Sequence, residues 1–140
     1  MAEERSDPTF VPYDIETEQG LLGLSLIHPH LIPVIRAEAS AADFYEEVHQ
    51  QLFELVYEFD DEQRAVTPIT LNAWAKHLPG FKEVGGHTYL MSCAQAAPAI
   101  ERADSEHRMV RNMARHVAEM RVRREAESAL LDAQEKLKRG

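Results

Sequence analysis

Apolar and polar residues alternate most regularly between positions 43 and 59 of the chain. The apolar residues of this stretch recur at intervals of three and four, which places them on one face of an α-helix. They are Val48, Leu52, Leu55, Val56 and Phe59. The other face carries Glu46, Glu47, Gln50, Glu54, Glu58 and Asp61. The pattern predicts a helix that ends near residue 62, with one buried face and one acidic, solvated face.

Helical periodicity also predicts shorter helices over residues 15–27, 31–39, 71–78 and 84–96. Asp14 and Thr70 stand where N-cap residues are expected, because a short polar side chain can accept a hydrogen bond from the first free amides. Pro33 is compatible with a helix only in its first turn, where its missing N–H costs nothing. Gly85 and Gly86 indicate a tight helix entry with positive φ. Since no strand pattern is present, the sequence predicts an all-α fold.

Three parts follow one another along the chain. Residues 1–11 are polar and aperiodic, and we expect a disordered tail there. Residues 12–98 are predicted to form a helical head. Residues 99–140 are predicted to form a long helix or helical hairpin and the start of a linker, because positions 99–138 contain neither proline nor glycine. The apolar stripe of this last part is sparse, so a second helix, in this chain or another, is expected to pack on it.

Composition narrows the class of protein. The 140 residues suit one domain, and Cys93 is the only cysteine, so a disulfide framework is excluded. Neither a secretory signal nor an apolar run of membrane-spanning length is visible, and we expect a cytoplasmic protein without a membrane segment. The net charge is -9, with 15 acids and 2 bases in residues 1–62. This acidity argues against tight nucleic-acid binding by the chain alone.

The sequence contains no constellation that indicates catalysis or a cofactor. His28 and His30 flank a proline, but no further metal ligands lie at suitable spacing, so metal binding there is disfavoured. His49 lies at the edge of the apolar face and is predicted to be a buried histidine bonded to backbone. The Gly85 and Gly86 pair lacks a preceding strand and a P-loop lysine, so a structural role is favoured over phosphate binding.

Arginine is concentrated in the last third of the chain, at Arg102, Arg108, Arg111, Arg115, Arg121, Arg123 and Arg124. A solvated helix face with intrahelical ion pairs would explain the series, because surface charges of this kind contribute little energy. A protein interface is the main alternative, since arginine is favoured as an anchor there. Nucleic-acid binding is a weaker one.

Several segments resemble, in order and spacing, the N-terminal domain of the DnaB-type replicative DNA helicases. The resemblance covers about residues 12–112 and includes Asp-Phe-Tyr at 43–45 and Gly-Gly-x-x-Tyr-Leu at 85–90. Its signature positions are Glu18, Leu22, Gly23, Asp43, Phe44, His49, Phe53, Thr70, Gly85, Gly86, Tyr89 and Leu90. The chain departs from the family at Glu106 and His107, where Tyr-Ala is usual, and at Val117, where an arginine is usual. The Walker-type ATPase loop is absent from these 140 residues.

The resemblance implies a head of five or six short helices followed by a helical hairpin that pairs with that of a neighbouring subunit. It implies a non-catalytic domain without a cofactor that forms a homodimer or higher homo-oligomer and docks primase and a helicase loader. The overall acidity of the chain indicates that direct DNA binding is weak or absent. If the chain is a fragment, its parent would be an ATP-dependent DNA helicase. Within residues 99–131, the candidates for self-association are Ile100, Val110, Met113, Ala114, Val117 and Met120, and those for partner docking are Arg108, Arg111 and Arg115.

Two other functions stay open. A stand-alone regulatory adaptor of the same fold would bind a helicase, primase or loader without a motor in the same chain. A nucleic-acid-binding protein would use the arginine-rich helix and would show salt-sensitive affinity for DNA.

Overall fold

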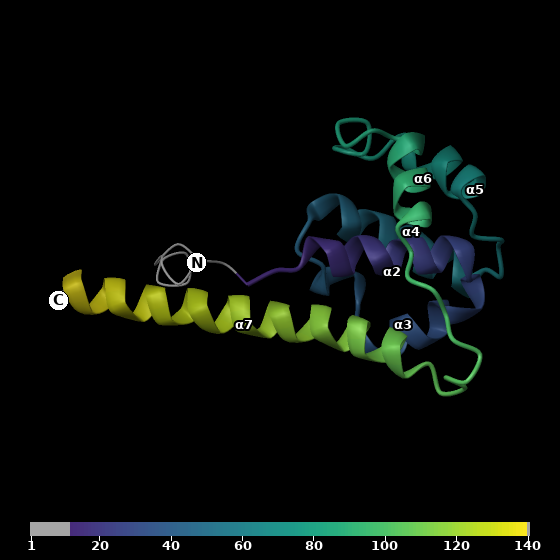
Figure 1. Ribbon diagram of the computed structural model, residues 1–140. Coiled ribbons are helices and arrows are strands. Elements are labelled where there is room, and N and C mark those ends of the chain that lie inside the picture. The colour runs from purple at the N-terminus through teal and green to yellow at the C-terminus, as the bar shows by residue number, and fades with distance from the viewer. Residues whose placement is uncertain (1–11, 140) are drawn as a thin grey trace.

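The computed structural model describes residues 12–139, and this part of the chain is helical without any strand (Figure 1). The all-α prediction is thereby confirmed, whereas the predicted disordered tail of residues 1–11 lies outside the described residues. The elements in chain order are α2 (Ile15–Ile27), η1 (Pro29–Leu31), α3 (Ile32–Glu38), η2 (Ala41–Asp43), α4 (Glu47–Asp61), α5 (Pro68–Ala75), α6 (His87–Gln95) and α7 (Arg108–Arg139).

We call the helices that precede α7 the head, and helix α2 lies at its centre. It packs against α4, α6 and α7 (Figure 1). Every residue from 20 to 26 is buried. The predicted start and end of this helix are confirmed: the Asp14 carboxylate accepts a hydrogen bond from the Thr17 amide at 3.1 Å, and the last helical residue is Ile27. Residues 20–26 of α2 carry small or apolar side chains around most of the helix, so this part is covered on all sides by neighbouring helices.

The most regular stretch of the sequence forms α4. Its apolar face is buried as predicted, except that Leu55 is only partly covered. The helix begins at Glu47, because residues 41–43 form a separate 3-10 turn. In that turn the Asp43 carboxylate accepts a hydrogen bond from the Ser40 amide at 2.8 Å.

The expected N-cap at Thr70 is wrong. Helix α5 is capped by Thr67, whose hydroxyl accepts from the Thr70 amide at 3.1 Å, while the Thr70 hydroxyl accepts from the Thr67 amide at 2.9 Å. Pro68 is the first helical residue, where its fixed φ suits the helix and its missing N–H is not needed. The helix therefore starts three residues earlier than expected. The glycine prediction is confirmed, since φ is +120° at Gly85 and +58° at Gly86.

Helix α7 starts at Arg108, nine residues later than the composition predicted. The Asp104 carboxylate accepts hydrogen bonds from the amides of Arg108 and Met109, and His107 has a left-handed φ of +55°. These local contacts end the preceding loop and begin the helix. The 32 residues of α7 form one continuous helix, about 48 Å long at about 1.5 Å per residue, so its described residues contain no hairpin (Figure 1).

Only the first half of α7 lies on the head. Val110, Ala114 and Val117 are buried there, whereas every residue from 125 to 139 is exposed. Figure 1 shows the second half projecting away from the other helices. No single helix in residues 12–139 is long and apolar enough to cross a membrane; a bent pair, residues 15–27 with 29–38, passes the same test only when its two parts are counted together.

Candidate functional site

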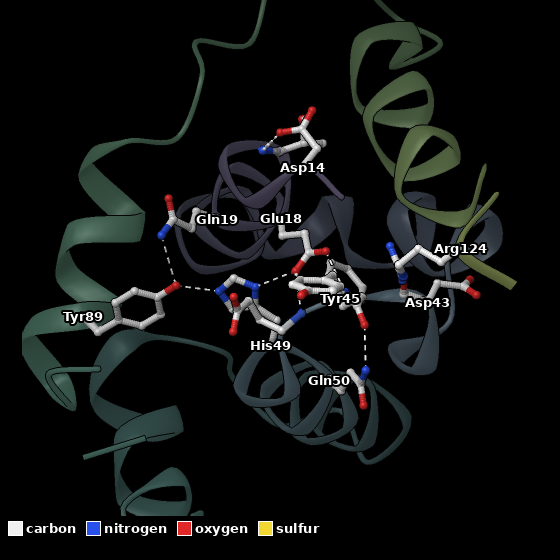
Figure 2. Close-up of polar contacts among 12 residues, drawn as sticks. Asp14, Glu18, Gln19, Asp43, Tyr45, His49, Gln50, Tyr89 and Arg124 are labelled. Atoms are coloured by element: carbon white, nitrogen blue, oxygen red, sulfur yellow. Dashed lines mark hydrogen bonds and ion pairs between the residues drawn. The ribbon is translucent and has the colours of Figure 1, made fainter. Parts of the chain in front are cut away.

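A buried polar network joins α2, α4 and α6 at the centre of the head. Glu18 is 1% exposed and His49 is 0% exposed. One oxygen of the Glu18 carboxylate lies 2.7 Å from Nδ1 of His49, and the carboxylate also accepts hydrogen bonds from the backbone amides of Tyr45 at 2.6 Å and Glu46 at 3.3 Å (Figure 2). The carboxylate is therefore compensated by three donors, which makes its burial tolerable.

The network continues on the other side of the imidazole. Nε2 of His49 contacts the Tyr89 hydroxyl, and this oxygen accepts a hydrogen bond from the Gln19 side chain at 3.2 Å (Figure 2). Burial raises the pKa of Tyr89, so the phenol is protonated and can donate to Nε2. With Nδ1–H donating to Glu18, the neutral tautomer satisfies both ring nitrogens.

These groups position the backbone between α2 and α4. A carboxylate, a histidine and a hydroxyl linked by hydrogen bonds can form an activated nucleophile, but that nucleophile must be able to reach a substrate. Neither described cavity is lined by Glu18, His49 or Tyr89. The network instead holds the segment 44–46 between α2 and α4. The predicted burial of His49 is confirmed, whereas its predicted backbone partner is wrong: both of its partners are side chains.

Other signature residues pack around the network. The rings of Phe44 and Phe53 stack with centroids 4.1 Å apart, and Leu22 and Leu90 are fully buried. Gly23 lies where α2 crosses α6, and a Cβ atom there would stand 2.0 Å from the Cys93 carbonyl oxygen. Of the remaining signature positions, Asp43 belongs to the 3-10 turn η2 and Thr70 to the capping box of α5. Gly85 and Gly86 lie at the entry to α6.

The six self-association candidates do not form a free stripe on α7. Val110, Ala114 and Val117 are buried against the head of the same chain, and Ile100 and Met113 pack partly against that core. Ile100 belongs to the loop before the helix. Met120 is half-buried. The apolar residues that α7 exposes strongly lie further on, at Val122, Leu130, Leu131 and Leu137.

The three docking candidates lie near the start of α7. Arg108 and Arg111 are exposed. Nε of Arg115 lies 3.2 Å from a carboxylate oxygen of Glu38 on α3, so this arginine already has a partner within the head. Sequence reasoning expected ion pairs within the helix, and the pair between Arg121 and Glu125 is one of these, at 2.8 Å.

A groove of about 890 Å³ lies beside Arg108, between the loop before α7, the first turns of α7 and the start of α2. Its apolar wall includes Ile100, Val110 and Met113, and its polar groups include Asp104 and His107. The sequence does not predict this groove, because the composition of residues 99–107 favours helix, whereas these residues form a loop. Among residues 12–139, no group of three or more histidine, cysteine, aspartate or glutamate side chains is placed to hold a metal ion.

A helical head, a projecting helix and a buried polar network together define an all-α domain. The chain belongs to the DnaB-like helicase N-terminal domain family, whose family model matches residues 11–112.

Curated relatives agree with this assignment. The chain is 25% identical over 113 residues to the replicative DNA helicase DnaB of Treponema pallidum, which covers 81% of this chain and 26% of the relative. It is 28% identical over 99 residues to the DnaB of Geobacillus stearothermophilus, covering 71% of this chain and 22% of the relative. The chain thus spans about a quarter of the length of these helicases.

A solved structure shares the fold. The crystal structure of the N-terminal domain of DnaB helicase from Mycobacterium tuberculosis matches with a TM-score of 0.77 and 21% sequence identity. The match covers 90% of this chain and 86% of that chain. The expected all-α family fold is therefore confirmed.

Proposed function

We propose that this chain is the oligomerisation and partner-docking domain of a replicative DNA helicase that acts in DNA replication in the cytoplasm. Family membership over residues 11–112 is the observation that carries the proposal. The matched relatives are replicative helicases, and the chain corresponds to only a fraction of their length. The motor activity would belong to a separate ATPase domain.

Self-association would use the exposed half of α7. Leu130 and Leu137 are seven residues apart, so they share a helix face, and their exposed fractions are 55% and 80%. Such a face on an isolated helix has no partner in the described part of the chain, and a second copy would bury it. This places the proposed contact further along the helix than the candidates at Val110, Ala114 and Val117.

Sedimentation equilibrium tests this proposal at tens of micromolar protein. We expect a homodimer or higher homo-oligomer that dissociates when Leu130 and Leu137 are both changed to serine. A matched control changes Glu127 and Glu135, which are also exposed on α7, to serine and should leave the mass unchanged. A wild-type protein that stays monomeric at this concentration contradicts self-association.

Partner docking would involve the start of α7 and the adjoining groove. Arg108 and Arg111 are exposed there, and arginine beside an apolar groove is typical of protein interfaces. We expect primase and a helicase loader as partners. Binding of purified primase, measured by calorimetry, should weaken at least tenfold in the variant with both arginines changed to alanine. The Arg123→Ala variant, exposed on the same helix, is the control, and equal losses in both variants refute this assignment.

A stand-alone adaptor that binds a helicase, primase or loader is the alternative function. The coding sequence downstream of Gly140 separates the two, since a P-loop domain in frame would support the helicase and a stop codon would support the adaptor. Direct DNA binding is expected to be weak or absent. Fluorescence anisotropy with single-stranded DNA at low salt should therefore show no saturable binding at micromolar protein.

A further inference from the structure

Helix α7 is fastened to the head by polar side chains beyond its last buried residue. Nη1 of Arg121 lies 3.1 Å from Oδ1 of Asp43. Arg124 donates two hydrogen bonds of 3.0 Å, one to the carbonyl oxygen of Pro12 and one to that of Asp43. Both arginines thus bind the same short segment between α3 and α4, and Arg124 also binds the chain just ahead of α2.

Arg124 makes a third contact through its guanidinium plane. Its central carbon lies 5.2 Å from the centroid of the Tyr45 ring, within the range of a cation–π interaction. The Tyr45 ring also stacks on Tyr13, with centroids 4.5 Å apart and planes inclined by 12°. A planar, always charged guanidinium suits this combination of a fork of hydrogen bonds and a ring contact, and a lysine could not reproduce it.

The segment that binds these arginines is itself held by a carboxylate in the interior of the head. Glu18 accepts hydrogen bonds from the amides of Tyr45 and Glu46, the residues that follow Asp43 and Phe44. Figure 2 shows Arg124 beside Asp43 and Tyr45, with Glu18 on the inner side. The segment is therefore fixed by the buried carboxylate on one side and contacted by α7 on the other.

Because Arg124 lies beyond the last buried residue of α7, its contacts influence the direction of the exposed half of this helix. Val117 is the last buried residue of α7, and all residues from 125 to 139 are exposed. Met120 is half-buried, so without the arginine contacts the free part of α7 would begin after Met120. These 19 residues form a lever of about 28 Å at about 1.5 Å per residue, and a tilt of about 10° would move the helix end by about 5 Å, close to the pitch of one helical turn.

We propose that Arg121 and Arg124 form a clamp that sets the direction in which the exposed half of α7 leaves the head. The clamp consists of these two arginines with Asp43, Tyr45 and the Pro12 carbonyl. Its importance for assembly rests on the proposed self-association, because a fixed direction presents Leu130 and Leu137 to a second subunit in one geometry. The clamp itself is a property of the single chain.

Electron–electron double resonance on the full 140-residue chain tests the clamp. Spin labels are placed at Glu54→Cys on α4 and Ala133→Cys on α7, both exposed positions. The natural Cys93 is buried, and burial raises the pKa of its thiol to about 11, so it reacts poorly with the label. Labelled protein is diluted with unlabelled protein so that only distances within one chain are measured.

We expect one narrow distance distribution for the parent and at least a doubled width for Arg124→Ala. Arg124→Lys keeps the charge but loses the fork, and it should give an intermediate width. Arg123→Ala, the exposed neighbour, should match the parent. Circular dichroism verifies that each variant keeps its helix content. An unchanged width in Arg124→Ala, or equal broadening in Arg123→Ala, overturns the clamp.

The result is independent of self-association. If the protein sediments as a monomer and Arg124→Ala broadens the distribution, the clamp is supported and self-association is refuted. If the protein is an oligomer and the width is unchanged, the clamp is refuted while self-association stands.

Discussion

Gly23 offers the sharpest test of how the head is packed. It lies in α2 where this helix meets α6, and a Cβ at this position would stand 2.0 Å from the carbonyl oxygen and 2.8 Å from the carbonyl carbon of Cys93. The ordinary contact distance begins at 3.4 Å, so Gly23→Ala would force α2 and α6 apart by about 1.4 Å. The clashing atoms belong to backbone, which cannot rotate away.

The expected change in the free energy of unfolding combines two opposing effects. Alanine favours a helix interior over glycine by about 1 kcal/mol. Overpacking costs about 1–3 kcal/mol in ordinary cases, and the cost here lies at or above the upper end because backbone must move. We expect Gly23→Ala to lower the free energy of unfolding by at least about 2 kcal/mol, which corresponds to a fall in Tm of about 6 °C for a domain of this size.

Gly20 supplies a matched control in the same helix. A Cβ there would meet only the terminal methyl of Met113 at 3.1 Å and a ring carbon of Pro98 at 3.7 Å. Because the Met113 side chain is flexible, Gly20→Ala should stay within about 1 kcal/mol of the wild type. Urea unfolding followed by circular dichroism measures both variants. Equal stability of the two variants would refute the close crossing of α2 and α6.

Three further predictions concern hydrogen bonds. Glu18→Gln should lower the free energy of unfolding by about 3 kcal/mol in urea unfolding, because the amide cannot satisfy three donors at a buried site; a loss below about 1 kcal/mol would contradict the network. Tyr57→Phe should cost about 1 to 2 kcal/mol, since its hydroxyl donates to the buried Ala39 carbonyl at 2.7 Å, and an unchanged urea midpoint would contradict this. Asp14→Ala removes the N-cap of α2 and should cost about 1 kcal/mol at pH 7. The pKa of Asp14 lies below its ordinary value of 3.8, since hydrogen bonds from Thr17 and the contact with His116 outweigh its partial burial. The stability it adds is therefore present above about pH 4 and lost as the pH falls further, so the difference between wild type and variant should shrink in acid.

Local chemistry accounts for the features that were predicted correctly. The apolar face of α4, the cap at Asp14 and the positive φ of Gly85 and Gly86 all depend on residues within a few positions of one another. Spacing and residue type determine such features directly. Thr70 shows the limit of this reasoning, because the helix expected to begin after Thr70 is capped by Thr67, and the reciprocal contact between Thr67 and Thr70 sets its start.

The arginine series shows the same limit over longer distances. The arginines can be recognised from residue type alone, but their surroundings differ. Arg111 is exposed, Arg115 pairs with Glu38 of α3, and Arg124 binds two backbone carbonyls of the head. The partners of Arg124 are 81 and 112 residues away in the chain. No spacing rule within one helix could assign them.

The sequence by itself determined the helical class, the extent of α2, that of α3 to within one residue and, through its motifs, the family. Tertiary structure alone decided where α7 begins, what its first half covers and how Glu18, His49 and Tyr89 meet. The contacts of His49 with Glu18 and Tyr89 span 31 and 40 residues. The physical reason is that helix periodicity and caps are encoded by neighbours in the chain, whereas buried polar partners are set by how whole helices pack.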